Sequence, residues 1–269
     1  EQRPELGGQI NYAVKIPGKE EFYEVLRFYR VMLEKYGVEL KLGQVVSAET
    51  TISGNYDAVV LATGVQPRKI ELEGSNHPKV LTYLDVLDKE RIVGQKVAVI
   101  GAGGIGIDVA HFLTAQTPFS GEVPDYLQGY GILDSEAALA LRKPKKREVT
   151  VLQRSVEKIG KRLGKTTGWA HIQTLKSHGV QLLPGATYLK IDDYGLHVRV
   201  ALKKGGEPQE IVLEVDNVIV AAGQEPKRDM ETSLRKVGLE VHVIGGAKEA
   251  SGLDAETAIK DGAELAVKF

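Results

Sequence analysis

The sequence predicts an α/β protein whose parallel sheets carry helices on both faces. Apolar segments rich in β-branched residues are typical of buried parallel strands, and here they alternate with segments of helical periodicity. A glycine-rich turn joins one such strand directly to one such helix. Alternation of strand and helix is the pattern from which open parallel sheets are built.

The expected strands are the apolar segments with the most valine and isoleucine. They occupy 56–64, 95–104, 148–154, 215–224 and 240–246. Apolar residues recur with helical spacing in 19–36, 105–114, 169–178 and 257–268. Residues 188–215 differ, because apolar and polar residues alternate there between turn signals. That pattern predicts an antiparallel meander.

The motif that carries most information is a G-x-G-x-x-G sequence made by Gly101, Gly103 and Gly106. It follows an apolar strand and opens a helical segment, which is the context of a dinucleotide-binding turn. Gly101 permits the tight turn, Gly103 lets a pyrophosphate approach the backbone, and Gly106 lets the helix pack against the strand. The N–H groups and positive dipole at the helix start would bind phosphate. The alternative is a tight turn that binds nothing.

The next strand indicates which dinucleotide is bound. In NAD sites an Asp or Glu at its end accepts hydrogen bonds from the adenosine ribose. Here the strand ends in Gln153 and Arg154. A guanidinium at this place would pair with a 2′-phosphate, so the sequence predicts NADP(H) rather than NAD(H). The alternative is an arginine that faces solvent. The long gap between motif and strand is explained if 116–147 is an insertion.

The opening residues match a later part of a second dinucleotide unit. Glu1 stands where a carboxylate would bind a ribose, and Gly8 and Gln9 stand where the chain would pass a flavin. The strand and glycine turn that precede such a carboxylate are not in the sequence. We therefore expect the chain to begin inside a flavin domain, as a piece of a longer polypeptide.

Two strands are expected to end in similar sequences, Ala-Thr-Gly at 62–64 and Ala-Ala-Gly at 221–223. Each lies where a chain would cross between two nucleotide-binding units. We therefore predict two interleaved three-layer domains. A partial FAD-binding domain comprises 1–70 plus 224–269, and an NADP(H)-binding domain comprises 71–223. The insertion at 116–147 is rich in residues typical of exposed segments and is expected to hold one short helix at 135–141.

Composition excludes several classes of function. A net charge of −1 over 269 residues gives no support for a nucleic-acid partner or an anionic membrane surface. No apolar run approaches the roughly 20 residues of a membrane span, and no signal peptide is visible, so we expect a cytoplasmic protein. The absence of cysteine excludes disulfides, thiolate metal sites and cysteine-ligated iron–sulfur clusters. Redox chemistry would therefore require an organic cofactor.

Segments throughout the chain carry a family resemblance, namely GGQ…IPGKEEFYE, HPKVLTYLDVL, GAGGIGIDVA, LGKTTGW, KIDDYGLHV, VDNVIVAAGQEP and LDAETAI. They resemble the C-terminal half of bacterial NADPH-dependent 2,4-dienoyl-CoA reductase. That family is similar to trimethylamine dehydrogenase and to the old-yellow-enzyme-related NADH oxidases. The resemblance implies two Rossmann-like domains of the pyridine-nucleotide-disulfide-oxidoreductase type.

The resemblance also implies a function in the oxidation of unsaturated fatty acids. Hydride would pass from NADPH to FAD, and electrons would continue through a 4Fe–4S cluster to FMN. The cluster and FMN belong to an N-terminal barrel domain that this sequence does not contain, so the chain alone is expected to be inactive on dienoyl-CoA. The alternative is a non-catalytic NADP(H)-binding fragment that does not retain flavin.

The resemblance assigns cofactor-binding residues but no catalytic side chain. The residues assigned to FAD are Glu1, Gly8, Gln9, Val46, Ala62, Thr63, Gly64, Gly245, Gly246, Leu253 and Asp254. The residues assigned to NADPH are Gly101, Gly103, Gly104, Ile105, Gly106 and Arg154, with Ala222 and Gly223 at the second crossover. Many flavoproteins have Gly-Asp in place of Gly245-Gly246, so this turn departs from their pattern.

Other polar residues are interpreted as structural. His111, His171 and His178 lack the spacing of metal ligands, and packing roles are favoured for them. Thr167 is expected to cap the helix that contains Trp169. A disulfide reductase of the same fold is excluded, because it would need a cysteine pair.

Overall fold

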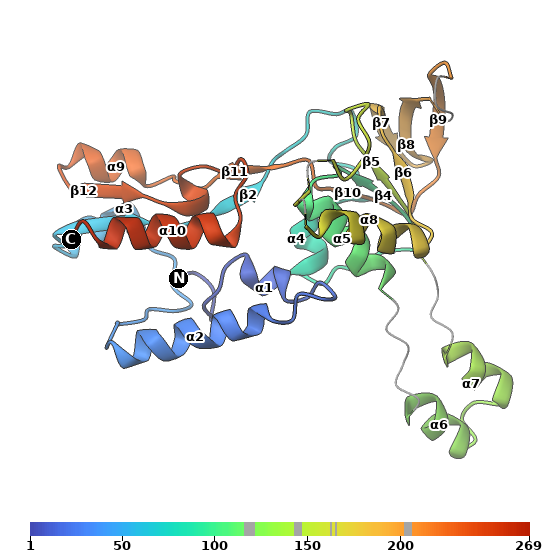
Figure 1. Cartoon of the computed structure of the whole chain (residues 1–269), viewed down its shortest axis with the longest axis horizontal. Helices are drawn as coiled ribbons and strands as arrows, with labels where there is room; N and C mark the ends of the chain where they lie inside the picture. The colour runs from blue at the N-terminus through green and yellow to red at the C-terminus, as the bar shows by residue number, and fades with distance from the viewer. Residues whose placement is uncertain (116–121, 143–146, 162, 165, 202–205) are drawn as a thin grey trace. The chain divides into compact units, whose positions relative to one another are not determined.

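The computed structural model describes residues 1–269 except 116–121, 143–146, 162, 165 and 202–205. The chain divides into two compact units (Figure 1). Unit 1 consists of Glu1–Lys69 and Gly223–Phe269, and unit 2 consists of Ile70–Ala222. The sequence predicted a division one residue further along at both points.

Unit 2 is built on a parallel sheet with the strand order β3-β10-β4-β5-β6. The strands are β3 (Val80–Thr82), β10 (Asn217–Val220), β4 (Lys96–Ile100), β5 (Glu148–Leu152) and β6 (Gln181–Leu183). Residues 97–100 of β4 are at most 1% exposed, as expected for a central strand covered on both faces. The predicted fold class, α/β with a parallel sheet, is confirmed.

Helices pack on one face of this sheet. They include α5 (Gly104–Thr114), which contacts β4 and β5, together with α4 (Tyr83–Leu87) and α8 (Gly168–Ser177), which contact α5. The helix α8 begins after Thr167 as predicted, but within the described residues the Thr167 side chain makes no capping hydrogen bond. Two further helices, α6 (Glu122–Gly129) and α7 (Ser135–Arg142), lie in the insertion, and α7 confirms the helix predicted there.

The other face of the sheet is covered by the meander. Its strands are β7 (Thr187–Asp192), β8 (Gly195–Val200) and β9 (Gln209–Leu213), paired antiparallel as predicted. The apolar side of β8 packs in one buried cluster with Ala98, Ile100 and Leu152 of the parallel sheet. The expectation of helices on both faces was therefore wrong for unit 2, because the alternating strands bury one apolar side against the sheet.

Unit 1 contains two small sheets. In one, β1 (Ala58–Leu61) pairs parallel with β12 (Glu240–Val243). In the other, β2 (Val65–Pro67) pairs antiparallel with β11 (Gln224–Pro226) where the two crossing segments meet. The remaining elements are α1 (Ile10–Ala13), α2 (Phe22–Lys35), α3 (Ala48–Ser53), α9 (Glu231–Lys236), the 3-10 turn η1 (Gly245–Ala247) and α10 (Ala255–Ala266).

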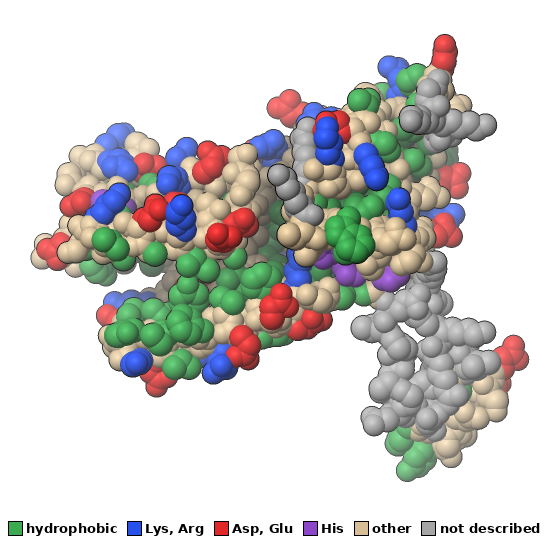
Figure 2. All heavy atoms as spheres, viewed as in Figure 1, with side chains coloured by type: hydrophobic (Ala, Val, Ile, Leu, Met, Phe, Trp, Pro, Cys, Tyr) green, Lys and Arg blue, Asp and Glu red, His purple; other side chains and the backbone are tan. Residues whose placement is uncertain are grey.

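The core of unit 1 is small. Leu61, Leu234 and Val241 form a buried cluster around the parallel strand pair. The long helices α2 and α10 are fully described, and neither contains a buried residue. Figure 2 shows hydrophobic side chains gathered over α2, where Tyr23 and Phe28 are more than half exposed. Unit 1 thus leaves apolar side chains of both helices exposed, including Ile259 of α10.

Candidate functional site: a glycine turn and its neighbouring strand end

The turn between β4 and α5 requires glycine at two of its positions. Gly101 has φ +113°, and a Cβ there would lie 2.3 Å from the Ala221 carbonyl oxygen. A Cβ at Gly106 would lie 1.9 Å from the Gly101 carbonyl oxygen. Both glycines therefore allow a close approach of backbone to backbone, as the motif predicts. The roles assigned to Gly101 and Gly106 follow directly from packing.

Gly103 and Gly104 are different, because they face open space. A Cβ built on either residue would meet no described heavy atom within 4 Å, and both residues are exposed. Gly103 is the N-cap of α5 and supplies no side chain to the N–H groups of the first turn, which includes Ile105. Such groups lack intrahelical partners and attract anions. The turn therefore has the room and the donors that a diphosphate needs.

The neighbouring strand places Arg154 at the same edge of the sheet. Leu152 of β5 is in register with Ile100, and its carbonyl accepts a hydrogen bond from Gly101 N at 2.9 Å. Arg154 follows two residues later and is exposed. Burial raises the pKa of Tyr188 to about 12, and the positive charge of Arg154 acts in the opposite direction, so the guanidinium lies within electrostatic range of that phenol.

Unit 2 thus brings together the predicted NADPH residues of its own segments. Ala222 lies beside the turn, since a Cβ on Gly101 would be 3.1 Å from Ala222 N. The glycine turn, the end of β5 and the end of β10 meet at the carboxyl edge of the parallel sheet, where ligands bind in folds of this kind. The described residues of unit 2 therefore fit a bound dinucleotide at the predicted NADPH site.

Several predicted FAD residues also converge within unit 1. A Cβ on Gly246 would lie 2.8 Å from Leu253 Cδ2 and 3.2 Å from the Gly64 carbonyl carbon. The Gly64 carbonyl accepts from Lys227 N at 2.9 Å, and the hydroxyl of Thr63, which follows Ala62, donates to the Lys227 carbonyl. Residues 62–64, η1 and the segment just before α10 are therefore neighbours.

The crossing segments of unit 1 lie next to the glycines near the N-terminus. Gln224 Nε2 donates to Gln9 Oε1 at 3.3 Å, and the Gly223 carbonyl accepts from Arg68 N at 3.1 Å. Gly8 has φ +50° and open space where a Cβ would be. Gly8 is therefore accessible to a ligand, although the side-chain amides of Gln9 and Gln224 beside it are already hydrogen-bonded to each other.

Two predicted residues, Glu1 and Asp254, have local structural roles. A carboxylate oxygen of Glu1 accepts from Arg3 N at 2.9 Å, and the Glu1 carbonyl accepts from Gln44 N at 3.0 Å, close to the exposed Val46. Asp254 caps α10 by accepting from Thr257 N at 2.7 Å. This hydrogen bond lowers the pKa of Asp254, so the carboxylate remains charged and occupied as a cap.

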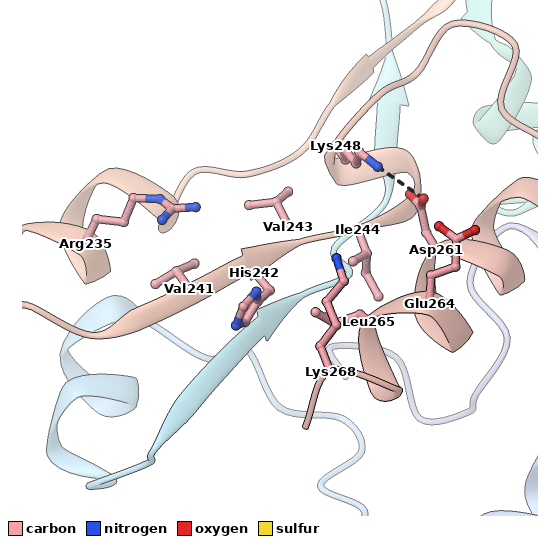
Figure 3. A pocket seen from close by; sticks show the side chains of 10 residues that line it. All are labelled: Arg235, Val241, His242, Val243, Ile244, Lys248, Asp261, Glu264, Leu265 and Lys268. Carbon is pink, nitrogen blue, oxygen red and sulfur yellow. Dashed lines mark hydrogen bonds and ion pairs between the residues drawn. The ribbon is translucent and has the colours of Figure 1, made fainter.

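A carboxylate does reach the Gly245–Gly246 turn, although no sequence motif indicated one. Asp261 of α10 accepts from Gly245 N at 3.0 Å and from Lys248 Nζ at 3.2 Å (Figure 3). The bond from Gly245 is the main reason that the pKa of Asp261 is lowered, and Lys248 adds to the effect. No local pattern could have identified Asp261, because it lies sixteen residues after Gly245.

A small cavity of about 270 Å³ lies beside this ion pair (Figure 3). The described residues that line it are Arg235, Val241, His242, Val243, Ile244, Lys248, Asp261, Glu264, Leu265 and Lys268. They come from α9, β12, the segment that follows β12, α10 and, for Lys268, the residues after α10, and none was predicted to bind a cofactor. The residues that line the cavity all belong to unit 1.

The histidines fit the structural interpretation. The His111 ring lies 6.2 Å from the His171 ring and 6.0 Å from the His178 ring, where α5 packs against α8. In the part of the chain that the structure describes, no three His, Cys, Asp or Glu side chains are grouped to hold a metal ion. Among the same residues, no helix has the length and apolarity to cross a lipid bilayer.

Comparison with known proteins finds a family of oxidoreductases and two reductases that are similar to this chain. Residues 7–251 match the model of the family described as pyridine nucleotide-disulphide oxidoreductase. The chain is 26% identical to a metal reductase of Desulforamulus reducens, over 92% of this chain and 36% of that protein. It is also 26% identical to a bilirubin reductase of Mediterraneibacter gnavus, over 97% of this chain and 35% of that protein.

A solved structure resembles the whole chain. The complex of 2-naphthoyl-CoA reductase with 2-naphthoyl-CoA matches with a TM-score of 0.80 and 25% identity, over 100% of this chain and 35% of that one. The chain therefore spans about a third of the length of each of these three proteins.

Proposed function

Because the chain belongs to the pyridine nucleotide-disulphide oxidoreductase family, we propose that it is the NADPH- and FAD-binding module of a flavin-dependent reductase. Unit 2 would hold NADPH, and unit 1 would contribute to the site for FAD. When both cofactors are bound, the flavin supplies the redox chemistry by accepting hydride from the nicotinamide. The protein supplies position and electrostatics, and no side chain is needed as a nucleophile.

The observation that carries this proposal is the open turn at Gly103 and Gly104, at the sheet edge where Arg154 follows β5. The N–H groups in the first turn of α5, which receive no side-chain cap from Gly103, would bind the diphosphate. Arg154 would then be available to the 2′-phosphate of the adenosine ribose, because β5 places it at the same sheet edge. The position lacks the carboxylate that an NAD site uses, which favours NADPH over NADH.

We further propose the dienoyl-CoA reductase branch, acting on acyl-CoA in fatty acid oxidation. The family segments of the sequence support it, and so does the likeness to 2-naphthoyl-CoA reductase. Substrate reduction would then require a barrel domain carrying FMN and a 4Fe–4S cluster as the partner of this module. The chain alone would oxidise NADPH with an artificial acceptor and would leave dienoyl-CoA unchanged.

The choice of NADPH is tested by replacing Arg154 with glutamine. We expect Arg154→Gln to raise the Kd for NADPH about tenfold to a hundredfold and to leave the Kd for NADH unchanged, since charge-assisted bonds to one phosphate are lost. Arg199→Gln is the matched control, because Arg199 is an exposed arginine of unit 2 that pairs with Glu210. Equal affinity for NADPH in both variants would contradict the assignment of Arg154.

A second candidate function is an NADP(H)-binding module that does not retain flavin. It is favoured by the small core of unit 1 and by the uncovered faces of α2 and α10. Purified chain incubated with FAD and passed through a desalting column distinguishes the two. A yellow protein that oxidises NADPH with an artificial acceptor supports the reductase module. A colourless protein that still binds NADPH supports the binding module.

A further inference from the structure

The side chain of Gln153 ties together the loop that follows β5. Its Nε2 donates to the Ser155 carbonyl at 3.1 Å and also to the Glu157 carbonyl. A primary amide has two N–H donors, so each carbonyl receives one of them. Since both partners are carbonyl oxygens, only the NH2 end of the amide can face them.

The same loop is fixed from its other side by the segment after β6. Gly185 N donates to the Ser155 carbonyl at 2.8 Å, and Ala186 N donates to the Gln153 carbonyl at 2.9 Å. Within the loop, Glu157 N donates to Ser155 Oγ at 3.2 Å. The backbone of 153–157 is therefore held by two sets of hydrogen bonds. One set comes from the backbone of Gly185 and Ala186, and the other comes from the Gln153 amide within the loop.

Arg154 lies in the sequence between Gln153, which carries the amide, and Ser155, whose carbonyl the amide binds. Its neighbours on the chain are Gln153 and Ser155, and both are held by the hydrogen bonds described above. The Arg154 side chain itself is exposed, and its charge reaches Tyr188 of β7. The loop thus fixes the backbone from which the guanidinium extends while leaving the guanidinium accessible.

The chemistry at position 153 requires an amide. A carboxylate there would be an acceptor facing two acceptors, and it would release the loop. An aliphatic side chain of similar size would remove the amide donor from the Glu157 carbonyl and would leave the Ser155 carbonyl only its bond from Gly185 N. Fixing the loop in advance removes the entropy that binding would otherwise cost, which raises affinity for the bound group.

We propose that Gln153 is a positioning residue that sets the orientation of Arg154 toward the 2′-phosphate. The inference rests on the proposed function, in which Arg154 recognises that phosphate. Gln153 would thus act on selectivity between phosphorylated and unphosphorylated adenosine, with no contact of its own to the ligand.

The test compares two nucleotide probes on the whole chain. Adenosine 2′,5′-bisphosphate carries the 2′-phosphate, and 5′-AMP lacks it. Isothermal titration gives the Kd of each probe for the unaltered chain, Gln153→Met, Arg154→Gln and the double variant. Gln173→Met is the matched control, because Gln173 is an exposed glutamine of α8 in the same unit. Thermal unfolding confirms that each variant is folded.

We expect Gln153→Met to weaken binding of the bisphosphate about tenfold, the effect of one or two lost hydrogen bonds, and to leave 5′-AMP unchanged. In the Arg154→Gln background the same change should have no further effect, since the two residues act as one unit. Gln173→Met should behave like the unaltered chain.

The other outcomes separate the two hypotheses. If Arg154→Gln loses the bisphosphate and Gln153→Met does not, the inference is wrong and the proposed function stands. Gln153→Met could weaken binding of both probes equally, or it could raise the Kd for the bisphosphate as much in the Arg154→Gln background as in the unaltered chain. In either case Gln153 only supports the fold in general, and the inference is wrong. If Arg154→Gln leaves bisphosphate binding intact, the assignment of Arg154 fails and the inference fails with it.

Discussion

At the scale of single residues, the glycines of the β4–α5 turn have two separable roles. A Cβ on Gly106 would strike the Gly101 carbonyl, whereas a Cβ on Gly103 would enter empty space. We expect Gly106→Ala to destabilise the chain by about 1–3 kcal/mol or more, because backbone atoms must move. Gly103→Ala should keep the stability of the unaltered chain and lose NADPH affinity by about tenfold or more, because its methyl group occupies the space of the phosphate.

Urea unfolding and NADPH titration on the same two variants measure both effects. The conformation of Gly103, with φ −78° and ψ −175°, is open to alanine, so strain does not complicate that variant. A Gly103→Ala protein that binds NADPH normally would show that the diphosphate does not approach this turn.

Local motifs indicated some candidate site residues and could not indicate others. The glycines and Arg154 could be proposed from the sequence, because their proposed roles depend on a strand end and the turn that follows it. Asp261 was not, because its contact with Gly245 N depends on how α10 returns to η1. In the sequence, Gln153 could be noticed only because it stands near the place where an NAD site has a carboxylate. Its hydrogen bonds to the Ser155 and Glu157 carbonyls depend on how the loop folds.

At the scale of elements, the long apolar strands and amphipathic helices were predictable and the short strands were not. The strands β3 and β6 each span three residues, which is too few to show a period. The meander was recognised from its alternation. Which face it covers depends on the route of the chain after β6, and no local pattern encodes that route.

The helix α2 provides a prediction at this scale. Phe28 is 54% exposed, whereas Leu234 of α9 is fully buried in the core of unit 1. Phe28→Gln should change the free energy of unfolding by less than about 0.5 kcal/mol, since little apolar area is lost and glutamine is a good helix former. Leu234→Ala, the control, should cost about 2–5 kcal/mol.

Urea unfolding of the isolated chain measures the difference between these variants. A loss for Phe28→Gln as large as that for Leu234→Ala would mean that the face of α2 is already buried in solution.

At the scale of the whole molecule, the two units have separate cores and separate parts of the proposed chemistry. Unit 2 contains the open glycine turn and Arg154, and unit 1 contains the converging segments around Gly64 and η1. A ligand that represents half of NADPH should therefore be held by unit 2 alone. Adenosine 2′,5′-bisphosphate is such a ligand, because it lacks the nicotinamide.

Hydrogen–deuterium exchange on the intact chain can measure which unit binds the bisphosphate. Saturating bisphosphate should slow exchange in peptides covering the first turn of α5 and the loop 153–157, because bound phosphates occupy the N–H groups and hold the loop. Peptides covering 62–64 and η1 should exchange as in the free protein, and added FAD should slow them instead. Equal protection of both units by the bisphosphate would contradict this division of cofactors, because it would require residues of unit 1 to bind the adenosine half of NADPH.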